Sequence, residues 1–141
     1  MVVRKARNQY EIERAYSIIK SSLPENKHRI ERMQNRRDLP LEIIVIEDDG
    51  IVHGALIGMD YKIRGSEPIS RVEFMAVIKQ RNGYGKELLN HYLKLKGNSD
   101  IKRIELDTKN NSPSERFFKK NGFKKYHVDE LGQSHLYFEY K

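Results

Sequence analysis

The chain of 141 residues carries 27 Lys and Arg against 20 Asp and Glu, a formal net charge of +7, and it contains no cysteine. This length suffices for one domain with its own core, and the lack of cysteine excludes disulfides, thiolate metal ligands and cysteine nucleophiles. Residues 1–7 lack the apolar core of a signal peptide, and no apolar run approaches the roughly 20 residues of a membrane span, so we expect a single cytoplasmic domain over residues 1–141 with no membrane partner.

Apolar runs and alternation predict seven strands. They are expected at residues 2–4, 41–47, 51–61, 70–77, 101–107, 123–129 and 134–140. The second and third of these surround Asp48-Asp49-Gly50, a turn typical of a β-hairpin. Gly54 and Gly58 interrupt the third strand, where we expect a bulge or a close neighbour.

Capping signals and helical periodicity predict four helices between these strands. Start signals lie at residues 8–11, 22–25 and 112–115, and the remaining helix follows the glycine-bearing loop that contains Gly83 and Gly85. The last start is the clearest, because Ser112 precedes Pro113 at the first helical position and Glu115 at the third. The resulting order is strand, helix, helix, three strands, helix, strand, helix and two strands, which predicts a mixed α/β sheet with helices on both faces.

The central stretch, residues 72–89, predicts a buried strand, a glycine-bearing loop and an amphipathic helix. Such a loop directs free backbone N–H groups at the helix N-terminus toward an anion. It is not a Walker A loop, which needs glycine in place of Gln80 and Ser or Thr in place of Glu87. A dinucleotide fingerprint starting at Gly83 needs a third glycine in place of Leu88 and is also excluded. A plain glycine-rich turn is the simplest alternative.

The segment Gln80-Arg81-Asn82-Gly83-Tyr84-Gly85 resembles the Q/R-x-x-G-x-G/A signature of the GCN5-related N-acetyltransferases, in which this loop binds the pyrophosphate of acetyl-CoA. Residues 106–123 resemble a second segment of the same family, a strand, an Asn-bearing loop, a short helix and a terminal Gly-Phe. The resemblance implies the acyl-CoA N-acyltransferase fold, with a mixed, mostly antiparallel twisted sheet of six to seven strands. It also implies transfer of the acetyl group from acetyl-CoA to a primary amine.

Position by position, the resemblance implies a cofactor site on the strand, the loop and the following helix. Backbone groups of Met75, Ala76 and Val77 would pair with the pantetheine arm as an added strand does. Asn111 and Phe118 would line the CoA arm beyond it. The pyrophosphate would be held by the residues of the loop and the first helical turn, Gln80, Arg81, Asn82, Gly83, Tyr84, Gly85 and Lys86. The side chains of Arg81 and Lys86 either add charge to this site or are plain surface residues.

Acetyl transfer to an amine requires a neutral nucleophile. An alkyl amine has a pKa of about 10.4, so a base is needed at neutral pH. The candidate is Glu73, the only carboxylate in an otherwise apolar strand, where family members often carry a Glu; the alternative is an ion pair with Arg71. A backbone N–H near Val77 would stabilise the oxyanion of the tetrahedral intermediate.

Two features depart from the family pattern. Only two residues separate Val77 from Gln80, where the family usually places a longer spacer, so the loop is shortened. Many members carry a tyrosine general acid at the position of Phe118, which cannot donate a proton. Water, Tyr84 or Tyr126 must then protonate the leaving thiolate, or transfer is slow.

The remaining candidate residues carry weaker signals. No metal site is predicted, because no metal-ligand spacing is present among the five histidines, His28, His53, His91, His127 and His135. His135 and Tyr137 on the last strand are candidates for contact with the acceptor, and a structural role in the sheet is the alternative.

The charge is uneven along the chain, with 10 basic and 5 acidic residues in 1–40, 4 and 7 in 41–79, and 13 and 8 in 80–141. Basic and aromatic residues do not alternate on any predicted strand, so nucleic acid is not the expected partner.

We therefore expect an acetyl-CoA-dependent N-acetyltransferase with a small-molecule or peptide amine acceptor. The alternatives are a catalytically weak or inactive acyl-CoA-binding module and an acetyltransferase acting on tRNA or a ribosomal protein. A homodimer is among the assemblies that the sequence allows.

Overall fold

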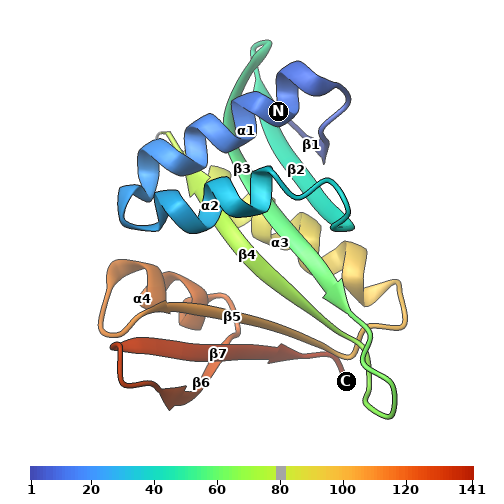
Figure 1. Ribbon diagram of the computed structural model, residues 1–141, viewed down its shortest axis with the longest axis vertical. Helices are drawn as coiled ribbons and strands as arrows, with labels where there is room; N and C mark the ends of the chain where they lie inside the picture. The colour runs from blue at the N-terminus through green and yellow to red at the C-terminus, as the bar shows by residue number, and fades with distance from the viewer. Residues whose placement is uncertain (79–81) are drawn as a thin grey trace.

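The computed structural model describes residues 1–78 and 82–141, and in these residues a seven-stranded sheet forms the centre (Figure 1). The strands are β1 (Val2–Lys5), β2 (Leu41–Asp48), β3 (Ile51–Tyr61), β4 (Ile69–Val77), β5 (Arg103–Lys109), β6 (Lys124–Val128) and β7 (Gln133–Glu139). They lie in the order β1-β2-β3-β4-β5-β7-β6, and every neighbouring pair is antiparallel except β4 and β5. The predicted mixed, mostly antiparallel sheet is confirmed.

The helices of the described residues follow the predicted order. They are α1 (Gln9–Ser22), the 3-10 helix η1 (Pro24–Asn26), α2 (Lys27–Gln34), α3 (Tyr84–Gly97) and α4 (Pro113–Lys120). The second predicted helix thus begins with a 3-10 turn, with Pro24 at its first position. No helix in the described parts of the chain is long and apolar enough to cross a membrane.

Two hydrophobic clusters hold the helices against opposite faces of the sheet (Figure 1). Helices α1 and α2 lie over β2, β3 and β4, where Ile19 packs with Val45 and Phe74. On the other face Leu89 of α3 and Phe118 of α4 belong to the second cluster. Each fully buried aliphatic side chain stabilises the fold by about 1.5–3 kcal/mol. The sheet is therefore fixed between two helical layers, which keeps β4 and the start of α3 in place.

Local capping signals explain where two of the helices begin. The Asn8 side chain accepts a hydrogen bond from the Glu11 backbone N–H at 2.9 Å, and Ser112 accepts one from the Glu115 N–H at 3.1 Å. Each bond satisfies a backbone donor that the helix itself cannot satisfy. The predicted starts of α1 and α4 agree with these caps.

The two glycines of β3 lie at irregular positions of the sheet, as predicted. A Cβ atom on Gly54 would lie 2.7 Å from Val77 Cγ1, and one on Gly58 would collide with the hydroxyl of Tyr92. The register also shifts beside each glycine: pairing with β2 skips His53, and pairing of β3 with β4 skips Glu73. Bulges redirect side chains and backbone groups, and they are frequent next to active sites.

Strands β4 and β5 separate along their length (Figure 1). Their pairing in the described chain covers three residue pairs and ends at Arg71 opposite Glu105, although β4 continues to Val77 and β5 to Lys109. Among the described residues, no strand therefore pairs with the inner edges of β4 and β5 over their C-terminal parts. This separation positions the site described next.

Candidate functional site

The edge of β4 that faces β5 presents backbone hydrogen-bonding groups. The Ile78 N–H donates to the His53 carbonyl of β3 at 2.8 Å, and Ala76 lies opposite Ala55 of β3. Since consecutive residues of a strand direct their backbone groups to opposite edges, those of Met75 and Val77 point toward β5, where pairing has ended. Of the three predicted pantetheine residues, Met75 and Val77 thus face the open edge, while Ala76 pairs with β3. An extended ligand can add to such an edge as a strand.

The N-terminus of α3 follows directly after this edge. Helix α3 begins at Tyr84, and its N-cap residue Gly83 has a left-handed backbone with φ 74° and no side-chain cap. The first backbone N–H groups of a helix have no intrahelical partner, so those of Tyr84, Gly85 and Lys86 are donors suited to an anion. Asn82 and Lys86 are exposed. The predicted loop residues Gln80 and Arg81 lie outside the described residues.

Gly85 leaves space at the first turn of α3. A Cβ atom there would lie 3.6 Å from the ring of Phe117, which is ordinary van der Waals contact, so the neighbouring side chains do not require glycine. The missing side chain leaves the helix N-terminus open to a ligand. Phe117 of α4 was not singled out from the sequence, because only the fold brings α4 against the start of α3.

The two residues predicted to line the CoA arm lie at α4. Phe118 is only 6% exposed and packs edge-on against Phe117 and Phe123, with ring centroids 5.2 and 5.6 Å apart. Asn111 has a left-handed backbone with φ 59°, and its N–H donates to the Glu115 carboxylate at 3.1 Å. The ring of Phe118 is therefore mainly a core side chain, and Asn111 shapes the turn before α4.

Glu73 occupies the bulge of β4, and its side chain is only 3% exposed. Its carboxylate accepts a hydrogen bond from the Tyr61 hydroxyl at 2.6 Å and one from Arg29 of α2 at 3.1 Å, and Arg71 Nε lies 3.9 Å away. Burial, and then the bond to Glu73, raises the pKa of Tyr61 to about 12, so this phenol remains a donor. The carboxylate is thus held in a fixed orientation, and the predicted pairing with Arg71 is only one of three contacts.

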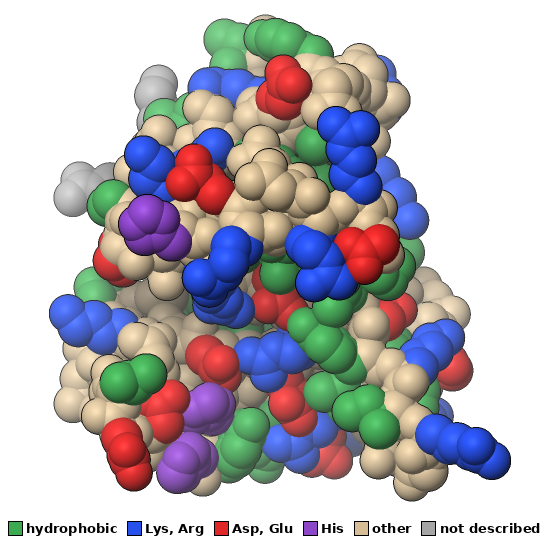
Figure 2. All heavy atoms as spheres, in the orientation of Figure 1, with side chains coloured by type: hydrophobic (Ala, Val, Ile, Leu, Met, Phe, Trp, Pro, Cys, Tyr) green, Lys and Arg blue, Asp and Glu red, His purple; other side chains and the backbone are tan. Residues whose placement is uncertain are grey.

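A network of charged side chains continues from Glu73 across the sheet. Arg71 contacts Asp107 of β5 at 2.9 Å, and Asp107 contacts Nδ1 of His135 at 2.7 Å. The other ring nitrogen of His135 lies 2.9 Å from Asp129. Carboxylates only accept, so both contacts of His135 are hydrogen bonds when both ring nitrogens carry protons. Figure 2 shows acidic and basic side chains side by side on this face, below α1 and α2.

Three tyrosines were predicted as proton donors or acceptor contacts, and they lie in different places. The Tyr84 hydroxyl donates to Asp48 at 2.9 Å, which turns it toward the β2–β3 hairpin. Tyr126 is 50% exposed on β6, and its ring centroid lies 5.7 Å from that of Tyr137 and 5.2 Å from the Arg103 guanidinium. Burial raises the pKa of Tyr126. Tyr126, Tyr137 and His135 thus form a group beside the charged network, while Tyr84 is separate from it.

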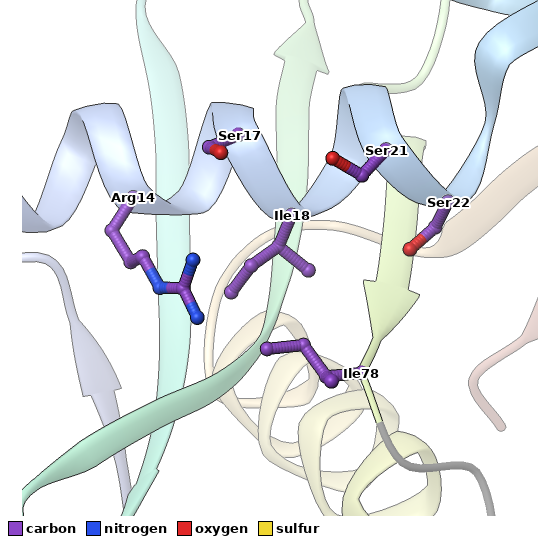
Figure 3. Close-up of a pocket in the computed structure, with 6 residues that line it drawn as sticks. All are labelled: Arg14, Ser17, Ile18, Ser21, Ser22 and Ile78. Carbon is purple, nitrogen blue, oxygen red and sulfur yellow. The ribbon is translucent and has the colours of Figure 1, made fainter.

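A hollow of about 250 Å³ lies between α1 and the end of β4. Figure 3 shows Arg14 and Ile18 of α1 pointing toward Ile78. The lining residues are Arg14, Ser17, Ile18, Ser21, Ser22 and Ile78. Because Ile78 directly follows β4, this hollow lies beside the end of that strand.

Known proteins resemble this chain in sequence pattern and in fold. The sequence model described as "Acetyltransferase (GNAT) domain" matches residues 40–125, and no curated protein matches at a significant level. The solved structure of Tetrahymena GCN5 has a TM-score of 0.80 and 21% identity, over 99% of this chain and 96% of that one. A GNAT family acetyltransferase from Elizabethkingia anophelis with acetyl-CoA bound has a TM-score of 0.75 and 15% identity, over 99% of this chain and 97% of that one.

The ribosomal-protein-alanine N-acetyltransferase of Brucella melitensis is similar over 99% of this chain and 100% of its own, with a TM-score of 0.74 and 16% identity. At such identities the solved structures show a shared fold. Because the family's sequence model matches more than half of the chain, the chain belongs to the GNAT family of acetyltransferases.

Proposed function

We propose that this protein transfers the acetyl group of acetyl-CoA to a primary amine by direct attack on the thioester. The main support is the separation of β4 and β5, which leaves the backbone groups of Met75 and Val77 facing an edge with no pairing in the described residues, shortly before the N-terminus of α3. An extended pantetheine arm along β4 would bring its pyrophosphate to the donors of Tyr84, Gly85 and Lys86. A carbonyl near Val77 would accept a hydrogen bond from the strand edge, which stabilises negative charge on that oxygen.

Glu73 takes the proton of the amine in this proposal. As the nitrogen–carbon bond forms, the amine becomes far more acidic, so a carboxylate becomes an adequate acceptor for its proton. Tyr61 and Arg29 orient the carboxylate but leave further lone pairs on its two oxygens free for the incoming amine. The carbon–sulfur bond then breaks, and the CoA thiolate takes a proton from water, since the Tyr84 hydroxyl is engaged by Asp48.

A second candidate function is a module that binds acyl-CoA without transferring the acetyl group. It is favoured by Phe118, whose buried ring has no proton to donate where many relatives have a tyrosine. Affinity for acetyl-CoA is common to both functions. Turnover with an amine distinguishes them.

Release of free thiol from acetyl-CoA is the direct test of transfer. The chain has no cysteine, so a thiol reagent reports CoA alone, without background from the protein. The amines should include small molecules and peptides, because similar structures include a ribosomal-protein-alanine N-acetyltransferase and a NatC complex with a Gag peptide. We expect amine-dependent thiol release with at least one acceptor. Binding of acetyl-CoA without thiol release on the whole panel would favour the inert module.

We also propose that residues 1–141 act as one domain, because one sheet runs from β1 to β7 through both halves of the chain. A cytoplasmic location is part of the proposal and is supported by the absence of cysteine.

A further inference from the structure

The β2–β3 hairpin contacts the start of the connection between β4 and α3. His53 lies in the bulge of β3, where pairing with β2 skips it. Its backbone carbonyl accepts a hydrogen bond from the N–H of Ile78, the first residue after β4, at 2.8 Å. The bulge therefore fixes the point at which the chain leaves the sheet.

The same hairpin contacts the end of that connection. Tyr84, the first residue of α3, is only 6% exposed, and its ring stacks on the imidazole of His53 with a centroid distance of 4.9 Å and an interplanar angle of 17°. Its hydroxyl donates to Asp48 Oδ2 at 2.9 Å, and His53 Nε2 lies 3.2 Å from the Asp48 carbonyl. The tyrosine of the glycine motif is thus directed into the protein and away from the ligand side.

We infer that Asp48 and His53 are positioning residues for acetyl-CoA: from the β2–β3 hairpin they fix the end of β4 at Ile78 and the start of α3 at Tyr84. Only six residues, 78–83, join β4 to α3. The pantetheine edge and the donors of the α3 N-terminus must keep a fixed separation to bind one ligand at both places. The inference rests on the function proposed above.

The electrostatics of the contact agree with this role. The hydrogen bond from Tyr84 lowers the pKa of Asp48, and the same bond raises the pKa of Tyr84. The carboxylate and the phenol therefore keep their acceptor and donor states through neutral pH. The N-terminal ammonium group lies 3.6 Å from Oδ1 of Asp48, the carboxylate oxygen that Tyr84 does not contact.

The test compares two ligands that share the same arm. CoA occupies both the β4 edge and the pyrophosphate site, whereas pantetheine occupies the edge alone. Asp48→Ala should raise the Kd for CoA about tenfold, since a hydrogen bond to a charged group that orders the site is lost. The Kd for pantetheine, followed by NMR at millimolar concentrations, should change by less than about twofold.

Two further variants make the result specific. Tyr84→Phe removes the same hydrogen bond from the other side, so the double variant should bind CoA no more weakly than Asp48→Ala alone. The matched control is Tyr140→Phe, because the Tyr140 hydroxyl donates to the Leu93 carbonyl near the other end of α3. This control should lower thermal stability and leave the ratio of the two Kd values unchanged.

Three results would overturn the inference. The first is an unchanged Kd for CoA in a folded Asp48→Ala protein. The second is an equal loss of affinity for CoA and for pantetheine, and the third is additive losses of CoA affinity in the double variant. Each of them excludes a positioning role. Should Asp48→Ala not fold, Asp48→Asn, which keeps a neutral acceptor oxygen, must show a smaller shift in the same direction. A wild-type protein that binds neither ligand contradicts the proposed function itself, and the inference with it.

Discussion

Glu73 is the residue on which the proposed chemistry depends most. Its bulge position places the carboxylate on the α1–α2 side of β4, and its neighbours Tyr61 and Arg29 come from β3 and α2. A buried carboxylate with two donors is well oriented and cannot rotate freely. A general base needs such an orientation. The same carboxylate is also an ion-pair partner of Arg29, so a variant must separate the catalytic role from the structural one.

Glu73→Gln should lower kcat/KM by about 100-fold near neutral pH, because a general base contributes about that factor or more. The amide oxygen can still accept from Tyr61, so the geometry is largely kept. The deficit should shrink at higher pH, where hydroxide can take the proton of the reacting amine in place of Glu73. Glu105→Gln is the control, since Glu105 also pairs with Arg71, at 3.5 Å. Equal losses in both variants would show that charge balance around Arg71, and not proton transfer, explains the effect.

Single residues also show how far the sequence predicts the site. The strand that contains Met75 and Val77 and the helix that begins after Gly83 follow from local signals, namely alternation and a glycine motif. The partners of Glu73 do not, because Arg29 and Tyr61 are distant in sequence and reach it only through helix packing and the bulge. The same holds for Tyr84, whose place in a ligand-binding motif gave no sign that its hydroxyl turns toward Asp48.

Among the elements, the helix starts were predictable and the sheet irregularities only partly so. Asn8 and Ser112 cap α1 and α4 through bonds to residues three positions later, which is information that a short segment contains. The glycines of β3 indicated close neighbours, but which strand would bulge depends on the fit of Tyr92 and Val77 against them. The separation of β4 from β5 has no local signal at all.

A cluster of charges joins β1, α1 and β2 and makes stability depend on pH. The hydrogen bond from Arg4, and then the backbone N–H of Arg7, lower the pKa of Glu11 to about 2. The carboxyl pKa is lower in the folded protein than in the unfolded chain, so its contribution is complete above about pH 4.5 and is lost as the pH falls toward about 2. Glu47 supplies a second carboxylate to Arg4 at 2.9 Å.

Glu11→Gln should therefore reduce the free energy of unfolding at pH 7 by about 2 kcal/mol. Denaturant titrations at several pH values should also show a flatter decline of stability between about pH 4.5 and 2 in the variant than in the wild type. Glu13→Gln, on the exposed side of the same helix, should change stability by less than about 0.5 kcal/mol. An unaltered acid dependence in Glu11→Gln would mean that other carboxyl groups govern acid unfolding.

At the scale of the whole molecule, the fold joins two sheet halves at a short parallel contact. Strands β1 to β4 and strands β5 to β7 meet at three residue pairs, and α3 packs behind this junction while the network from Glu73 through Arg71 to Asp107 crosses it in front. The open edge of β4 and the N-terminus of α3 are consequences of this arrangement. We propose that together they form one binding site for acetyl-CoA.

The most direct test of this claim is isothermal titration with acetyl-CoA, for the wild type and for Gly85→Glu. We expect one site with a Kd in the micromolar to submillimolar range, about the range in which enzymes bind such substrates. Gly85→Glu should weaken binding by about 100-fold or more, because it places a carboxylate and bulk at the first turn of α3, where an anion would sit. The fold should survive, since among the described residues only the Phe117 ring lies within 4 Å of a Cβ atom at this position.

The control for that measurement is Asn90→Glu, which adds the same charge to an exposed position of α3, away from its start. It should bind acetyl-CoA as the wild type does. We expect a measurable affinity in the wild type, its loss in Gly85→Glu and its retention in Asn90→Glu. No heat of binding at millimolar acetyl-CoA, or an affinity that is the same in the wild type and Gly85→Glu, would contradict it.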